Sequence, residues 1–240
     1  MTFFCPFFLL QRSEGIQLEL YEDSIDDMFS NCKEEMRKML SAKFSYKLEE
    51  KGYETHCVDE KSKIEKIDDI LTQEELQAIR VYTEHTNAVY KIFNPAVRTG
   101  KNEYGKNICQ FHKLYFLLVS SVQKLKIADK EKCYTTYKRY SSEVKFKSDK
   151  IRLGSFASSS LTPDQKDYGK KSCLKIKTCH GADIEKYSAY PEEKEVLIPP
   201  YEMFELTKNN DVKELKDCET TFVLESIGTK SNLDCKLVKK

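Results

Sequence analysis

The N-terminal half of the chain carries apolar residues at helical spacing. Between residues 24 and 40 they recur every three or four positions, behind a capping-box-like tetrapeptide that begins at Ser24. Thr72 and Glu75 form a second capping box in front of another apolar stripe. A third stripe, after residue 107, comprises Phe111, Leu114, Tyr115, Leu118, Val122 and Leu125. These spacings predict three amphipathic helices, and the charged stretch 43–69 adds a further predicted helix with a loop.

After residue 130 the pattern changes to the alternation that is typical of strands. The predicted strands are 133–140, 144–146, 151–156, 173–179, 195–198, 204–207 and 220–224. Helices first and strands later predict an α+β fold and not a parallel α/β sheet. The eight glycines form no Gly-x-Gly-x-x-Gly or Walker loop, so a dinucleotide would have to be held in another way.

Composition limits the partners of the chain. Its 240 residues suffice for one domain with a sizeable core. Forty basic and 39 acidic residues leave a net charge of +1, and the lysines are interspersed with acids. We therefore expect no nucleic-acid partner and no binding to an anionic membrane. No apolar run is long enough to span a bilayer.

Nine cysteines indicate disulfides and an oxidising compartment. None has the spacing of zinc ligands, so no metal site is predicted. Residues 1–19 are interpreted as a degenerate or truncated signal segment, because the apolar run 3–10 is short, contains Pro6 and lacks a basic start. The expectation is secretion, with the cytoplasm or retention in the endoplasmic reticulum left open. The last six residues have no apolar tail for a lipid anchor.

Two glutamates stand where a short strand begins. Glu193 and Glu195 alternate with Lys194 and lead into Val-Leu-Ile, so on a strand they would point to one face, about 7 Å apart. Such a pair is either a solvated edge, which is the more common case, or a site that handles positive charge.

A serine run lies some thirty residues before the glutamates. In Phe-Ala-Ser-Ser-Ser, a strand would place Ser158 and Ser160 on one face beside the ring of Phe156. Serine runs are more often turns or linkers, but this one is flanked by Leu153 and Leu161 and not by more Ser and Gly.

These motifs, in this order, resemble a known family. Phe-x-Ser-x-Ser is followed by Lys-Thr-Cys-His-Gly-Ala, Tyr-Ser-Ala-Tyr-Pro and Glu-x-Glu-Val-Leu-Ile-Pro-Pro. The set closely resembles the vertebrate, fish-like ecto-mono-ADP-ribosyltransferases that modify arginine, whose site is an Arg-Ser-Glu set. The resemblance runs from about residue 20 to residue 235.

The resemblance implies a fold and an activity. The expected fold is one domain over 20–240, in which a helical part (20–130) precedes a β-rich catalytic part (131–240) of two facing, mainly antiparallel sheets around an NAD cleft. The expected reaction transfers ADP-ribose from NAD to exposed arginines of proteins and releases nicotinamide, without a metal. The resemblance also implies a monomer that is secreted.

The resemblance also implies roles for single residues. Glu195 would bind the ribose 2′-hydroxyl and stabilise the positive charge that develops on the ribose. Glu193 would orient the acceptor guanidinium, and Ser158, supported by Ser160, would position Glu195. Phe156 would pack near the nicotinamide ring or simply belong to the core. Tyr187 and Tyr190 would lie in the loop that meets the acceptor.

One position departs from the family pattern. The family's arginine, which binds the NAD pyrophosphate, is replaced by Lys138, and Arg139 follows it as a second candidate that would need a bulge to reach the cleft. Lysine keeps the charge but loses the two-pronged contact. The open alternatives are therefore a catalytically impaired pseudoenzyme that binds NAD or a partner, and a protein that is mainly an NAD glycohydrolase.

The family pairs cysteines that match Cys32 with Cys235 and Cys133 with Cys179. The pairing of the remaining cysteines stays open, namely Cys57, Cys109, Cys173 and Cys218.

Two other chemistries are disfavoured. A glycoside hydrolase places its carboxylates on opposite sides of the bond, and the four histidines fit no hydrolase motif.

Overall fold

The computed structural model describes residues 15–43, 67–86, 88–105, 111–129, 132–207 and 212–238. Its α-helices are α1 (Lys33–Lys43), α3 (Gln73–Thr83), α4 (Tyr90–Thr99) and α5 (His112–Ala128). Short 3₁₀ helices are η2 (Gly100–Asn102), η3 (Lys166–Tyr168), η4 (Pro191–Glu193) and η5 (Lys213–Leu215). The predicted signal segment 1–19 lies outside the described residues up to residue 14, as does nearly all of the stretch 43–69.

Two of the predicted helices form as expected. At α3 the hydroxyl of Thr72 accepts from the backbone N–H of Glu75, and the Glu75 carboxylate accepts from the N–H of Thr72, so the capping box is confirmed. In α5 all six residues of the apolar stripe are buried or directly precede the helix. The sequence pattern missed α4, which contains Pro95 and buries only Phe93 and Val97.

The first helix is shorter than predicted. The chain is irregular from residue 24 to the start of α1 at Lys33. The cause is that the two aspartates expected to begin the helix bind other parts of the chain instead. Asp26 binds Arg152 at 2.6 Å, and Asp27 accepts from the N–H groups of Phe29 and Cys235. Tertiary contacts of these carboxylates therefore override the apolar spacing.

The strands form an eight-stranded sheet in the order β4-β9-β10-β6-β2-β5-β8-β7 and a two-stranded parallel sheet, β1-β3. Their bounds are β1 Ile16–Leu18, β2 Tyr134–Tyr140, β3 Val144–Phe146, β4 Lys150–Arg152, β5 Ala157–Ser160, β6 Ser172–Thr178, β7 Ala182–Asp183, β8 Glu195–Ile198, β9 Glu202–Thr207 and β10 Thr220–Thr229. Within the large sheet only β10 and β6 pair in parallel. The predicted α+β fold with mainly antiparallel strands is confirmed.

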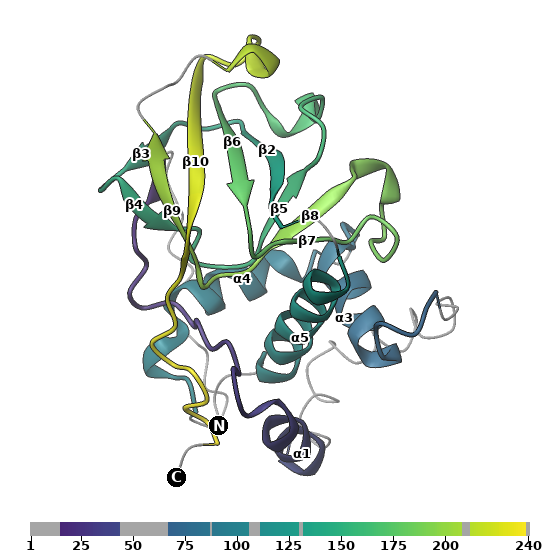
Figure 1. Ribbon diagram of the computed structural model, residues 1–240. Helices are drawn as coiled ribbons and strands as arrows, with labels where there is room; N and C mark the ends of the chain where they lie inside the picture. Colours follow the sequence, from purple (N-terminus) through teal and green to yellow (C-terminus); the bar gives the residue numbers. More distant parts are fainter. Residues whose placement is uncertain are drawn as a thin grey trace, which may run out of the picture.

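The large sheet divides at one place. A single residue pair, Tyr137 with Ser160, joins β2 to β5, whereas β2 pairs with β6 over its whole length. The group β5-β8-β7 therefore turns away from the rest of the sheet, and Figure 1 shows it lying across the lower ends of β2 and β6, next to α3, α4 and α5.

Among the described residues, two large apolar clusters cover this sheet, and a small third one surrounds Cys173 and Leu215. The larger joins the helices to Phe156, Leu197 and Tyr201, and the smaller lies between β1-β3 and the strands β4, β6, β9 and β10. The helices thus hold β5 and β8 from one side, and these two strands carry the serine and glutamate motifs.

The described residues form three disulfides. The two pairs that the resemblance implies, Cys32–Cys235 and Cys133–Cys179, are formed, and Cys173–Cys218 is a third. Cys5, Cys57 and Cys109 lie outside the described residues. The first disulfide ties the start of the helical part to the C-terminal segment, which for so long a loop stabilises the fold by about 5 kcal/mol. The described residues contain no cluster of metal ligands and no helix that could cross a membrane.

Candidate active site

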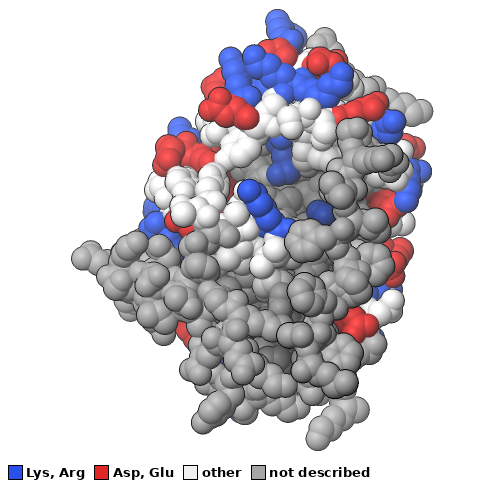
Figure 2. Space-filling model, turned by 180° about the vertical axis from the view of Figure 1, so that it is seen from behind, with Lys and Arg blue, Asp and Glu red and all other residues white. Residues whose placement is uncertain are grey.

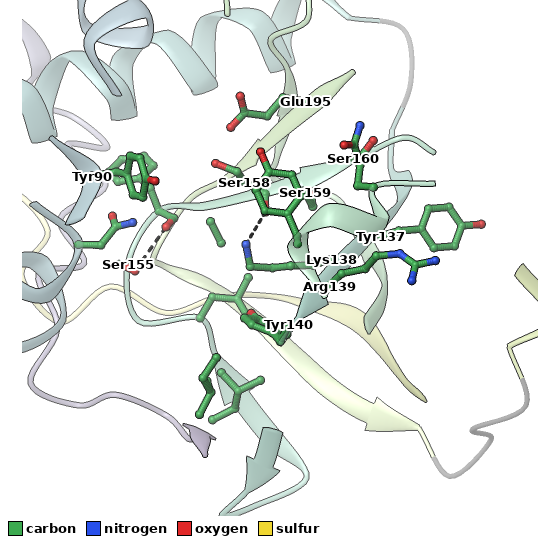
Figure 3. A pocket seen from close by; sticks show the side chains of 18 of the residues that line it. Tyr90, Tyr137, Lys138, Arg139, Tyr140, Ser155, Ser158, Ser159, Ser160 and Glu195 are labelled. Carbon is green, nitrogen blue, oxygen red and sulfur yellow. Dashed lines mark hydrogen bonds between the residues drawn. The ribbon is translucent and has the colours of Figure 1, made fainter. Parts of the chain in front are cut away.

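A cleft of about 1250 Å³ opens where β2 and β5 separate. Its walls come from β1, the end of α3, α4, β2, the segment Leu153–Ser160, η3 and the start of β8. Figure 3 shows Lys138, Ser158 and Glu195 close to one another, whereas the side chains of Tyr137 and Arg139 point away from them. Every residue in the predicted catalytic and cofactor-binding sets lines the cleft, namely Lys138, Arg139, Phe156, Ser158, Ser160, Glu193 and Glu195. The volume suits a ligand larger than a drug-sized molecule.

Glu195 is the buried carboxylate of this cleft. It is the first residue of β8, opposite Ser160 of β5, and its exposed fraction is 3%. Ser188 donates a hydrogen bond to Oε2 at 3.3 Å. None of the described residues donates a hydrogen bond to Oε1. Burial raises the pKa of Glu195 to about 7, the negative charge of Glu193 adds to the rise, and Ser158 and Lys138 oppose it. An acceptor oxygen without a partner in a buried place favours a ligand hydroxyl or a positive charge.

The sequence predicted that Glu193 and Glu195 lie on the same strand, and this prediction is wrong. Glu193 ends η4, and Lys194 adopts a left-handed conformation (φ 47°) before β8 begins. The Ser160 hydroxyl fixes this turn by donating to the Glu193 carbonyl at 2.7 Å. The side chain of Glu193 therefore stands at the rim, 22% exposed, where Tyr168 donates to its Oε1 at 2.5 Å. The two carboxylates differ in burial because a turn separates them.

Lys138 reaches into the cleft from β2. Its ammonium donates to the Ser158 carbonyl at 2.7 Å and lies over the ring of Tyr140, as Figure 3 shows. Burial lowers the pKa of Lys138 to about 8, and Arg98 lowers it further, whereas Glu195 raises it. At pH 7 the ammonium is thus mostly charged, because its pKa lies only about one unit above that pH.

Arg139 does not place its guanidinium in the cleft, which corrects its assignment to the cofactor-binding set. The pairing of β2 with β6 is continuous and has no bulge, so neighbouring side chains point to opposite faces. The guanidinium donates to both carboxylate oxygens of Asp217, at 3.0 and 3.1 Å, and to the Pro163 carbonyl at 2.8 Å. Arg139 is therefore a structural residue behind β2.

Arg98, on α4, is a second cation of the cleft that the sequence reasoning missed. Its guanidinium donates to the Ser155 hydroxyl at 3.0 Å and lies over the ring of Tyr21. Among the described residues its Nε has no hydrogen-bond partner. Tyr90, Asn94 and Arg98 follow each other at four-residue spacing and all line the cleft. This polar stripe is the signal that would have revealed them.

The remaining candidates are placed as follows. The serine run is a strand, β5, and not a linker. The ring of Phe156 is fully buried against Phe93 and Tyr82, so it belongs to the core and only borders the cleft. Tyr187 is also buried and donates to Asp68, whereas Tyr190 donates to Glu84 near the rim.

Acidic and basic side chains both line the cleft. Glu193 and Glu195 stand at the β8 end, and Lys138 and Arg98 come from β2 and α4. Figure 2, a view from behind, shows basic side chains in a hollowed part of that face and side chains of both signs along the edge above it. Such an arrangement fits a ligand with an anionic part and a part that becomes positive.

Comparisons with known proteins agree with this geometry. The model of the NAD:arginine ADP-ribosyltransferase family matches residues 18–232. NAD(P)(+)–arginine ADP-ribosyltransferase 2 of Gallus gallus is 32% identical over 179 residues, 70% of this chain and 54% of that protein. Ecto-ADP-ribosyltransferase 5 of Bos taurus is 38% identical over 136 residues, 53% of this chain and 43% of that protein. The chain thus spans about half the length of each of these two relatives.

The fold is also that of solved structures. The eukaryotic mono-ADP-ribosyltransferase ART2.2, as a variant in complex with NADH, superposes with a TM-score of 0.75 at 22% identity, over 92% of this chain and 98% of that one. Fold and cleft thus define an ADP-ribosyltransferase-like protein. With a family match over most of its length, the chain belongs to the NAD:arginine ADP-ribosyltransferase family.

Proposed function

We propose that this protein is an NAD-dependent mono-ADP-ribosyltransferase that modifies arginine side chains of other proteins. The observation that carries the proposal is the buried Glu195, whose Oε1 has no partner among the described residues, in one cleft with Lys138 and Ser158. The family match and the names of the relatives support the same reaction.

The cleft fits NAD at both ends. Lys138 and Arg98 would hold the pyrophosphate, because each brings a positive charge from the lining of the cleft. Ser158 and Glu195 would hold the nicotinamide ribose, with the free Oε1 accepting from a ribose hydroxyl. NAD supplies the ADP-ribosyl group, whose C1′ becomes positive as neutral nicotinamide leaves with the bonding electron pair.

The two glutamates would act on different reactants, Glu195 on the ribose and Glu193, at the rim, on the acceptor. Glu195 stabilises the positive charge at C1′ in a buried place, where a carboxylate acts more strongly than in water. Glu193 binds the acceptor guanidinium, which stays charged at any working pH. One guanidinium nitrogen forms the bond to C1′, and the proton it loses passes to the Glu193 carboxylate.

Lys138 in this position favours a second candidate function, which takes one of two forms. A lysine makes a single contact with a phosphate, whereas an arginine can make two parallel hydrogen bonds. The loss of one charge-assisted hydrogen bond weakens binding by about 1.5 to 3 kcal/mol. A pseudoenzyme that binds NAD without turning it over, or a protein that mainly hydrolyses NAD, is the second candidate. Arg98 favours the active form, because it adds a guanidinium to the same cleft.

The relatives that are named ecto-ADP-ribosyltransferases, together with three disulfides, support action outside the cell or at its surface, on proteins with exposed arginine.

The test is transfer from labelled NAD to polyarginine. The proposal predicts label on polyarginine with the unaltered chain and none with Glu195→Gln. Binding of NAD without either transfer or nicotinamide release would instead support the pseudoenzyme.

A further inference from the structure

Glu193 is held by two side chains that come from outside the loop between β7 and β8. Tyr168, on η3, donates its hydroxyl to Oε1 of Glu193 at 2.5 Å. His85, just after α3, places its Nε2 3.8 Å from the same oxygen. Both contacts are therefore on one oxygen. None of the described residues forms a hydrogen bond or an ion pair with Oε2.

Tyr168 is fixed in place by its own segment. Gly169 follows it in a conformation (φ 127°) that other residues rarely adopt, and a Cβ there would meet the backbone of Ser141 at 2.3 Å. The N–H of Lys171 donates to the Tyr140 carbonyl at 3.0 Å. The short helix that carries Tyr168 is thus packed on the end of β2, the strand that carries Lys138.

His85 is fixed as well. Its ring stacks on that of Tyr190 at a centroid distance of 4.3 Å. Tyr190 in turn donates to the Glu84 carboxylate at 2.9 Å, so the end of α3 and the loop before β8 are joined beside Glu193. The two donors are nevertheless accessible, since the side chain of His85 is 41% exposed and Tyr168 is 46% exposed.

We propose that Tyr168 and His85 are positioning residues for Glu193 that set the choice of acceptor. They occupy Oε1 and leave Oε2 for the incoming side chain, so the acceptor makes a single hydrogen bond to Glu193. The nitrogen that contacts Oε2 can then give its proton to Glu193 as it forms the bond to C1′, whereas a two-pronged contact would divide the carboxylate between two nitrogens. The exposed ring of Tyr168 offers a face on which a planar cation can lie.

The proposal rests on the proposed function and adds to it the two residues that favour its guanidinium acceptor. The site takes a guanidinium in preference to the ammonium of a lysine, because an ammonium is compact, strongly hydrated and cannot stack. The test uses agmatine as the guanidinium probe and cadaverine as the matched amine, with NAD as donor. Nicotinamide release without any acceptor is measured beside transfer.

Tyr168→Phe removes the hydroxyl and keeps the ring. We expect its KM for agmatine to rise about tenfold, the worth of one hydrogen bond to a charged group, while the KM for NAD changes far less. Tyr168→Ala should weaken agmatine further and lower the preference for agmatine over cadaverine, and His85→Ala should raise the KM for agmatine. Tyr134→Phe and His180→Ala, which change the same residue types away from the cleft, are the controls.

Two results would overturn the inference. An unchanged KM for agmatine in Tyr168→Phe and His85→Ala would show that Glu193 needs no positioning. An equal rise in the KM values for agmatine and NAD would show a general disturbance of the cleft. Failure of the proposed function is seen separately, because the unaltered chain would then transfer nothing to agmatine, and the inference would fall with it.

Discussion

Replacing Lys138 by arginine tests how the cleft binds the NAD pyrophosphate. The ammonium of Lys138 is held among buried groups, and burial lowers its pKa to about 8. Below that pH it is charged and can bind a phosphate, and above it the charge is lost. Arginine stays charged throughout the range in which proteins are stable. The Lys138→Arg variant should therefore differ from the unaltered chain most strongly in alkaline solution.

The magnitude follows from the titration. With a pKa of about 8, about nine tenths of Lys138 is charged at pH 7, about half at pH 8 and about a tenth at pH 9. The charged fraction of Lys138 falls about tenfold between pH 7 and pH 9, while the ionised fraction of Glu195, whose pKa is about 7, about doubles. The kcat/KM for NAD should therefore fall about fivefold in the unaltered chain. In Lys138→Arg this fall should vanish, and the fork adds a gain of about one to two orders of magnitude at neutral pH.

The assay is kcat/KM for NAD between pH 6 and pH 9.5 at saturating agmatine, because this ratio reports the titration of the free enzyme. Lys175→Arg is the matched control, since Lys175 lies outside the cleft and pairs with Glu214. An alkaline fall that persists unchanged in Lys138→Arg would refute the reasoning, because another group would then be the one that titrates.

Three further substitutions separate the roles in the cleft. Glu195→Gln should abolish both transfer and NAD hydrolysis. It should also stabilise the fold, because the raised pKa of Glu195 favours the native state below about pH 4.5 and this contribution is lost as the pH rises through about 7. In thermal melts the variant should therefore gain up to about 3 kcal/mol of stability over the unaltered chain between pH 5 and pH 8. A gain that does not depend on pH would contradict the burial of a charge there. Glu193→Gln should lose transfer to agmatine but keep NAD hydrolysis, and equal loss of both activities would disprove this division of labour. Arg139→Ala should lower the free energy of unfolding by about 1 to 3 kcal/mol, because it removes the contacts with Asp217 and Pro163, and should leave kcat/KM for NAD within about twofold. A large loss of that ratio would mean that Arg139 reaches the cleft.

Local patterns predicted the elements that carry the site. The capping box at Thr72, the apolar stripe of α5 and the run Glu195–Ile198 each have a local cause, and each forms as expected. The stretch before α1 was predicted wrongly, because Asp26 and Asp27 bind groups about two hundred residues away, such as the N–H of Cys235. No local pattern contains such partners.

The candidate site divides in the same way. Ser158 and Glu195 stand in motifs and were found in the sequence. Arg98 and Tyr168 stand in no such motif, and they join the cleft only because α4 and η3 fold against β5 and β2. The left-handed turn at Lys194 was not predicted either, because the alternation of a strand was extended back to Glu193, whereas β8 begins at Glu195. That turn makes one glutamate buried and the other accessible.

The most direct measurement of the central claim is the rate of nicotinamide release from NAD by the unaltered chain as agmatine is increased, with the ADP-ribosylated product quantified in parallel. If the protein is an arginine-specific ADP-ribosyltransferase, the rate rises to a plateau with agmatine and one agmatine is modified for each additional nicotinamide released. Release that stays constant while agmatine remains unmodified would contradict that claim and identify a protein that only hydrolyses NAD.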